Sequence, residues 1–192
     1  MRVLVACEFS GTVRDAFRKL GHDAWSCDLL PCDGDPTWHY QQDVLTIMDK
    51  GWDLMIAHPP CTHLAVSGAA WFNKKQKEQA EALVFVQALL DAPIPRIALE
   101  NPVSIISTRI RKPEQIIQPY MFGHMEQKKT CLWLKGLPKL VETYNVFEEM
   151  MNLPKNKRER LHYLPPSPDR WKLRSKTYQG IADAMAAQWG KL

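Results

Sequence analysis

The chain has 192 residues, of which 45% are hydrophobic and 24% charged, and these values suit one folded globular domain rather than a disordered chain. The net charge is only +4, and no apolar run approaches the ~20 residues that cross a bilayer. The N-terminus enters an apolar segment at once, without a signal-peptide pattern, and the five cysteines show no disulfide spacing. We therefore expect free thiols, no membrane association and a cytoplasmic location.

The apolar segments alternate between short runs and longer periodic stretches. Short runs predict strands, and 3.6-residue periodicity predicts helices. In chain order we expect a strand at 3–7, a helix at 12–20, strands at 22–27 and 53–57, a helix at 73–90, strands at 96–100 and 130–134, and a helix at 181–189. This alternation predicts an α/β fold with a doubly wound, mainly parallel sheet.

The segment 138–170 is rich in proline, lysine and arginine and is expected to be irregular. Basic residues crowd the C-terminal third and predict either a surface for a polyanion or a solvated basic face: Lys155, Lys157, Arg158, Arg160, Arg170, Lys172, Arg174 and Lys176. Trp71, Trp133 and Trp189 have apolar neighbours, which favours core packing over base stacking.

The strand at 53–57 ends in His58-Pro59-Pro60-Cys61. Proline fixes φ and donates no backbone hydrogen bond, so the strand must stop before Cys61. The carboxyl ends of parallel strands form the ligand-binding edge of such sheets. Cys61 is therefore a candidate nucleophile on a stiffened loop.

Three features predict a site for a nucleoside-type cofactor. Phe9-Ser10-Gly11 follows the first strand, where a glycine permits close backbone approach and the next helix offers its N-terminus. Asp28 follows about 20 residues later, a spacing suited to ribose hydroxyls, and Asp43 could accept from an adenine amino group. Both acids could instead be solvated loop residues or helix caps.

Glu100 ends the strand at 96–100, so it is expected at the same sheet edge as Cys61. A thiol and a carboxyl group facing one pocket can activate an electron-poor ring by addition. The alternative for Glu100-Asn101-Pro102 is an ordinary strand-ending turn.

Taken together, these residues resemble the cytosine-C5 DNA methyltransferase family, and short phage and prophage members look most similar. The matching segments follow the family's order: Phe9-Ser10-Gly11, Asp28, Asp43, Pro59-Pro60-Cys61 with Ser67, Glu100-Asn101-Pro102-Val103, Gln127-Lys128-Lys129-Thr130 and Gln179-Gly180-Ile181-Ala182. The chain departs from the family in lysines that replace arginines at 128–129. It also lacks room, in roughly 135–176, for a target-recognition domain.

The resemblance implies a Rossmann-like methyltransferase fold over 1–192, with the segment 138–170 standing in place of the recognition domain. It implies S-adenosylmethionine as cofactor, held by Phe9, Ser10, Gly11, Asp28 and Asp43. It makes Cys61 the nucleophile at C6 of cytosine and Glu100 the group that binds N3 and the amino group. Pro60, Ser67, Asn101, Lys128 and Lys129 would then contact the substrate.

The expected partner is DNA, bound through the basic C-terminal region, with short or relaxed sequence preference and room for a separate specificity partner; a phage-encoded chain would act in the host cytoplasm. Two alternatives stay open for function: a catalytically silent DNA-binding module, and an enzyme that modifies a free cytosine nucleotide. A zinc site at His58, Cys61 and His63 is the weaker rival, because their spacing fits no paired ligand motif and no metal is expected.

Overall fold

A seven-stranded sheet forms the centre of the protein, in the order β3-β2-β1-β4-β5-β7-β6. The computed structural model describes residues 1–192, apart from the side chain of Trp71, whose expected core position therefore lies outside the described residues. The strands are β1 (Arg2–Ala6), β2 (Asp23–Asp28), β3 (His39–Gln41), β4 (Leu54–Ala57), β5 (Arg96–Pro102), β6 (Gln115–Ile117) and β7 (Thr130–Lys135).

The first five strands of the order run parallel, and β7 is antiparallel to both of its neighbours. The expected α/β class and mainly parallel sheet are thus confirmed. After β1 the chain moves outward through β2 and β3, then returns to the other side of β1 as β4. The carboxyl ends of β1 and β4 therefore flank a topological switch point, where open α/β sheets bind ligands.

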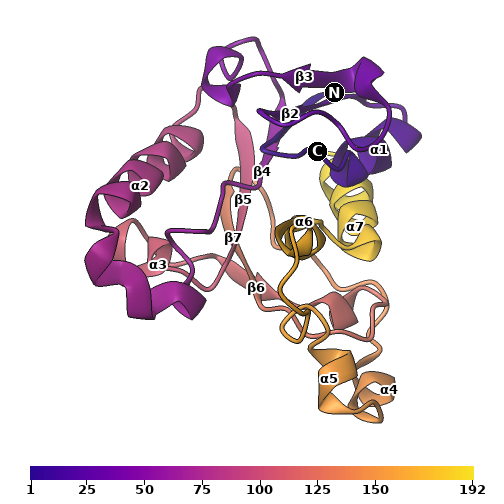
Figure 1. Ribbon diagram of the computed structural model, residues 1–192. Coiled ribbons are helices and arrows are strands. Elements are labelled where there is room, and N and C mark those ends of the chain that lie inside the picture. Colours follow the sequence, from indigo (N-terminus) through magenta and orange to yellow (C-terminus); the bar gives the residue numbers. More distant parts are fainter.

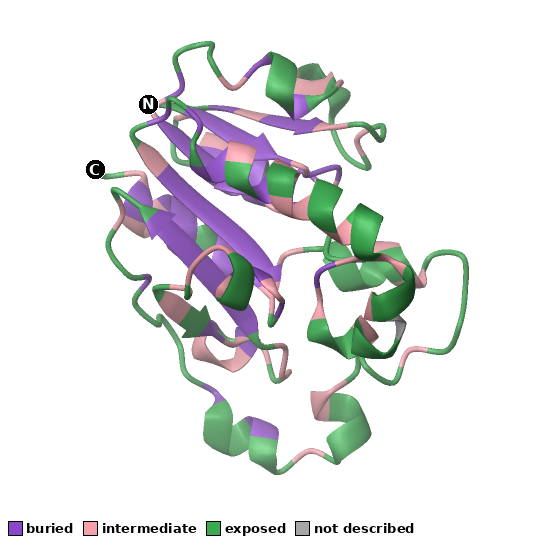
Figure 2. Ribbon diagram, turned by 90° about the vertical axis from the view of Figure 1, so that its left-hand side faces the viewer, coloured by how far each residue is buried: buried purple, intermediate pink, exposed green. Residues whose placement is uncertain are grey.

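Both faces of the sheet are covered, as its apolar strands require. Alternate residues of β1 enter different core clusters: Val3 and Val5 pack on one face, and Leu4 and Ala6 on the other. Helices α1 (Thr12–Lys19) and α7 (Gln179–Trp189) cover the first face, and α2 (Gln76–Leu90) covers the second (Figure 1). The central strands are buried almost throughout (Figure 2), and Trp133 and Trp189 are core residues, as expected.

The remaining helices are short. They are α3 (Ile106–Arg109), α4 (Phe147–Met151), α5 (Lys155–Arg158) and α6 (Arg170–Ser175), with 3-10 helices at Pro36–Trp38, Val44–Thr46, Val66–Lys74 and Pro119–Met121. Within 138–170 only α4 and α5 form before α6 begins, so this part of the chain is largely irregular. No helix among the described residues is both long and apolar enough to cross a membrane.

Several predicted boundaries differ from the structure, two of them near the candidate site residues. The helix expected at 73–90 begins at Gln76, because the backbone at Lys75 leaves helical geometry. Ser67 lies in the 3-10 helix Val66–Lys74 that precedes it. The strand expected to end at Glu100 continues to Pro102, since β7 pairs with it there. Strands β3 and β6 were not predicted, because three residues are too few to show a pattern.

Candidate active site

The turn after β1 is shaped by Glu8, a residue that the sequence analysis did not single out. Its buried carboxylate accepts hydrogen bonds from the backbone N–H groups of Val13 (2.7 Å) and Arg14 (3.2 Å). Glu8 thereby satisfies two of the free N–H groups at the start of α1. These two N–H groups are therefore occupied by Glu8 rather than free for a ligand.

Gly11 stands at the N-terminus of α1 with φ 74°, a left-handed conformation that favours glycine. A Cβ at this position would lie 2.5 Å from Nη2 of Arg14, so the glycine makes room for the Arg14 side chain. Phe9 is covered by Trp171 of α6, with 5.6 Å between the ring centroids. Phe9, Ser10 and Gly11 are absent from the residues that line the cavity described below.

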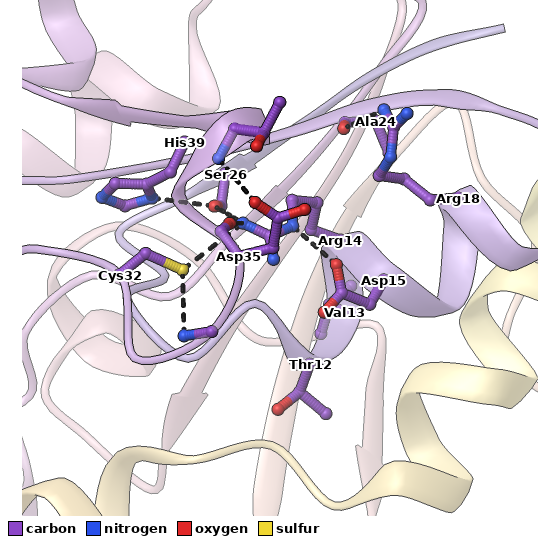
Figure 3. Close-up of polar contacts among 12 residues, drawn as sticks. Thr12, Val13, Arg14, Asp15, Arg18, Ala24, Ser26, Cys32, Asp35 and His39 are labelled. Atoms are coloured by element: carbon purple, nitrogen blue, oxygen red, sulfur yellow. Dashed lines mark hydrogen bonds and ion pairs between the residues drawn. The ribbon is translucent and has the colours of Figure 1, made fainter.

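The fully buried Arg14 guanidinium joins α1 to the segment that follows β2 (Figure 3). Its Nη1 donates to Oγ of Ser26 (3.1 Å), to Sγ of Cys32 (3.4 Å) and to the carbonyl oxygen of Asp35 (3.0 Å), and its Nε donates to Asp15 (2.7 Å). These bonds hold the 32–35 loop, which begins a few residues beyond Asp28.

A cavity of about 410 Å³ opens at the carboxyl ends of β1, β2 and β4. Asp28 and Asp43 both line it, as expected, and so does Pro60. Each aspartate also accepts a local backbone hydrogen bond through Oδ1, from Leu30 (2.9 Å) and Leu45 (3.0 Å) respectively. Asp43 thus also caps the 3-10 helix Val44–Thr46, whereas the bond to Asp28 closes a turn after β2. The second oxygen of each carboxylate can still accept from a ligand.

The cavity is acidic with apolar walls. Its described lining comprises Cys7, Cys27, Asp28, Leu29, Gln42, Asp43, Val44, Leu45, Pro60, His63, Glu78, Glu81, Ala82 and Phe85. Four of these residues carry carboxylates, and none is a lysine or an arginine. Such a lining suits a ligand with an apolar ring, hydroxyl or amino donors and positive charge, and it disfavours phosphate.

The cysteines differ sharply in their environment. Burial raises the pKa of the Cys27 thiol to about 12, and it raises the pKa of Cys7 further, with Asp28 adding to the effect. Burial also raises the pKa of Cys131. Cys61, by contrast, is exposed. Its carbonyl oxygen accepts from the N–H groups of Leu64 and Ala65, which folds the chain into a turn directly after Pro59-Pro60.

Glu100 and Asn101 meet the loop that carries Cys61. The Asn101 side-chain amide donates to the carbonyl oxygen of Pro59 (2.9 Å), which joins the end of β5 to the Pro-Pro segment. His58 Nδ1 lies 3.3 Å from Glu100 Oε2, and both side chains are about nine-tenths buried. Beyond that ion pair, two buried atoms of this cluster have no hydrogen-bond partner among the described residues: His58 Nε2 and Asn101 Oδ1. Buried polar atoms that lack partners point to a site completed by a ligand.

Charges in this cluster are coupled. Burial opposes the charging of His58, but the carboxylates of Glu100 and Glu8 outweigh it and raise its pKa. Burial likewise opposes ionisation of Glu100, yet His58, Lys128 and Thr177 bring its pKa below the ordinary value. Burial raises the pKa of Glu8 in spite of the opposing charge of His58.

The two lysines at 128–129 are separated by the structure. Lys128 acts electrostatically on Glu100 and His58, and its Nζ lies 5.9 Å from the ring centroid of Tyr178. Lys129 is exposed and acts on Cys131 instead. Ser67 is exposed within its 3-10 helix. Gly180 lies in the first turn of α7, where a Cβ would overlap the carbonyl oxygen of Phe122, so close packing explains that glycine.

The zinc alternative depends on three ligands that the fold uses differently. His58 faces Glu100, His63 lines the cavity and Cys61 is exposed. Within the described part of the chain, no three side chains among the histidines, cysteines and acidic residues are grouped to hold a metal ion.

Some residues of the basic C-terminal region form ion pairs with acidic residues elsewhere in the chain. Lys172 and Lys176 pair with Asp33 (3.9 and 2.9 Å), and Arg160 pairs with Glu126 (2.9 Å). Lys155, Lys157 and Arg174 are exposed. Helix α6 thus lies against the loops that follow β1 and β2, which is why Phe9 is withdrawn from solvent.

Neither a protein-family profile nor a curated protein matches the chain. Among solved structures, one similar chain is a candidate DNA modification methyltransferase encoded within an E. coli prophage. The similarity has a TM-score of 0.43 at 13% sequence identity and covers 81% of this chain. This chain spans only 56% of that protein's length.

The His58–Glu100 pair predicts a pH-dependent effect on stability. We expect Glu100→Gln to cost more free energy of unfolding at about pH 5.5 than at about pH 9. A raised histidine pKa stabilises the fold fully below the ordinary value of about 6.5, and this contribution is lost as pH rises through the folded-state pKa. Urea unfolding of both proteins at both pH values measures the difference. Glu148→Gln, at an exposed position, is the control, and an equal cost at both pH values would contradict the prediction.

Proposed function

We propose that the protein is an S-adenosylmethionine-dependent methyltransferase that acts at C5 of cytosine in DNA, with short or relaxed sequence preference. One observation supports this above the others. The acidic, apolar-walled cavity opens at the sheet edge where Cys61 follows β4 and Glu100 lies near the carboxyl end of the neighbouring parallel strand β5. A cofactor site and a pair able to activate a pyrimidine ring thus share one edge.

The cavity residues fit the adenosine part of the cofactor. Asp28 would accept from the ribose hydroxyls, Asp43 from the adenine amino group, and Leu29, Val44 and Phe85 offer apolar surface to the adenine. The remaining carboxylates, Glu78 and Glu81, favour a positively charged ligand over a nucleotide phosphate. When bound, S-adenosylmethionine supplies a methyl group activated by a sulfonium.

Cys61 and Glu100 would divide the chemistry at the base. The Cys61 thiolate adds to C6, forming an S–C6 bond that makes C5 nucleophilic. Glu100 binds N3 and the amino group of the ring and stabilises this adduct. After methyl transfer, loss of the C5 proton and breaking of the S–C6 bond release the product. A cytosine within a duplex must first be flipped out of the stack.

The cofactor assignment is tested by calorimetry. Wild-type protein is expected to bind S-adenosylmethionine, and Asp28→Ala is expected to weaken binding by about 1–3 kcal/mol, because it removes charge-assisted hydrogen bonds. Asp49→Ala is the matched control, since Asp49 is exposed and outside the cavity lining. If the wild-type protein does not bind the cofactor, the silent DNA-binding module becomes the better reading.

The substrate is tested by comparing methyl transfer to duplex DNA, single-stranded DNA and dCMP. We expect activity on DNA that falls steeply between about 50 and 200 mM salt, because Lys155, Lys157 and Arg174 remain exposed for phosphates. Base-edge readers need side chains set into a groove, and the short helices of 138–170 provide no separate element of that kind. Activity confined to dCMP would favour the nucleotide-modifying alternative, and strict preference for a long site would contradict relaxed specificity.

A further inference from the structure

His58 pairs with the Glu100 carboxylate and is also acted on by the carboxylate of Glu8. Glu100 belongs to β5, and Glu8 directly follows the turn that ends β1. The charged groups that act on His58 are Glu100 at 3.3 Å, Glu8, and Lys128 with the opposite sign. His58 itself is the first residue after β4, with its N–H donating to the carbonyl oxygen of Ala6 (2.9 Å). The imidazole is therefore held by the sheet rather than by a mobile loop.

This arrangement creates a difficulty for Glu100 in the proposed reaction. Beside a charged His58, Glu100 is an ionised carboxylate, which can accept from the amino group of cytosine but has no proton for N3. Addition at C6 pushes electrons toward N3, so N3 must gain a proton or a donated hydrogen bond as the adduct forms. Glu100 consequently needs a proton source, and the buried histidine at 3.3 Å is in place to provide one.

We propose that His58 is a positioning residue that stores the proton for Glu100 and delivers it through that carboxyl group to N3 of the cytosine. This inference rests on the proposed function. As the Cys61 sulfur bonds to C6, the His58 Nδ1 proton moves to the ionised Glu100 carboxylate, and Glu100 passes that proton on to N3 of the ring. When the S–C6 bond breaks, the N3 proton returns through Glu100 to His58. The C5 proton leaves separately to solvent, so each turnover restores the starting charges.

The resting proton state can be tested without substrate or variant. The ring ¹⁵N signals of His58, followed by NMR against pH, are expected to titrate above the ordinary histidine range of about 6.5. In Glu100→Gln the same titration is expected to fall toward or below that range, because the Glu8 carboxylate alone then opposes the effect of burial. A His58 that is neutral throughout in the wild-type protein would overturn the inference.

The kinetic test uses His58→Gln, whose amide can still donate a hydrogen bond to Glu100 but has no proton to release. We expect kcat on DNA to fall on the order of 10²-fold with KM for DNA unchanged, as for loss of a general acid. Wild-type activity should fall as pH rises through the His58 titration, and in His58→Gln this limb should move to lower pH. His22→Gln is the control, because His22 directly precedes the N-terminal end of β2, whereas the candidate site lies at the carboxyl ends of the strands. This variant should keep the wild-type pH dependence of activity.

The outcomes separate this inference from the proposed function. Wild-type methyl transfer with an unchanged pH limb in His58→Gln overturns the proton-storage role alone. A wild-type protein that transfers no methyl group to any cytosine substrate overturns both. A shifted limb together with the raised NMR titration supports both.

Discussion

Replacing Cys61 with serine is expected to reduce methyl transfer to DNA on the order of 10³-fold or more, the scale of losing a catalytic nucleophile. A serine hydroxyl is not ionised near neutral pH and cannot match a thiolate as a nucleophile. Because Cys61 is exposed, the substitution should leave the fold and cofactor binding unchanged. Transfer of a labelled methyl group from S-adenosylmethionine to DNA measures the loss.

A second measurement follows the covalent step directly. DNA containing 5-fluorocytosine cannot lose its C5 substituent as a proton, so the wild-type protein should form a stable adduct that Cys61→Ser lacks. Cys32→Ser is the control, since Cys32 is a half-buried thiol that contacts Arg14 rather than the Pro-Pro loop. Undiminished turnover by Cys61→Ser would rule out the addition mechanism.

Trp189→Ala is expected to lower the free energy of unfolding by about 3–5 kcal/mol, the cost of emptying a well-packed aromatic site. Trp189 is fully buried between α7 and the face of the sheet shared with α1, and its Nε1 donates to the carbonyl oxygen of Pro138 (3.0 Å). The substitution removes both the packing and the hydrogen bond that joins α7 to the segment after β7.

Urea unfolding measures this loss, with Trp171→Ala as the matched control. Trp171 is 48% exposed and packs mainly on Phe9, so its removal should cost about 1 kcal/mol or less. Equal costs at the two tryptophans would contradict the assignment of Trp189 to the core. Trp189→Phe should recover much of the lost stability while the Pro138 hydrogen bond stays absent.

The parts of the fold that the sequence predicted well are those set by local patterns. The apolar run before Pro59-Pro60 predicts both the end of β4 and the exposure of Cys61, because proline acts on its own neighbourhood. Asp28 and Asp43 reach one cavity because Asp28 ends β2 and Asp43 follows β3, and these two strands end at the same sheet edge.

The parts that sequence reasoning missed depend on contacts between distant segments. Phe9 is covered by Trp171, 162 positions later in the chain, and the residues around Phe9 show no pattern that predicts this contact. His58 was considered only as a weak metal ligand, whereas its meaning comes from Glu100, on another strand. Glu8 offered a readable signal, since an acid a few residues before a helix can cap its free N–H groups.

The margins of the sheet bear on how the protein behaves at high concentration. An edge strand presents unpaired N–H and C=O groups that can template pairing with another chain. Here the two margins are β3 and β6, each three residues long, and the longer strands lie between them. Gln115 of β6 also bonds both the N–H and the carbonyl oxygen of Leu140 through its side chain. The protein thus offers little edge for a second copy to extend, which protects its apolar strands from sheet-to-sheet aggregation.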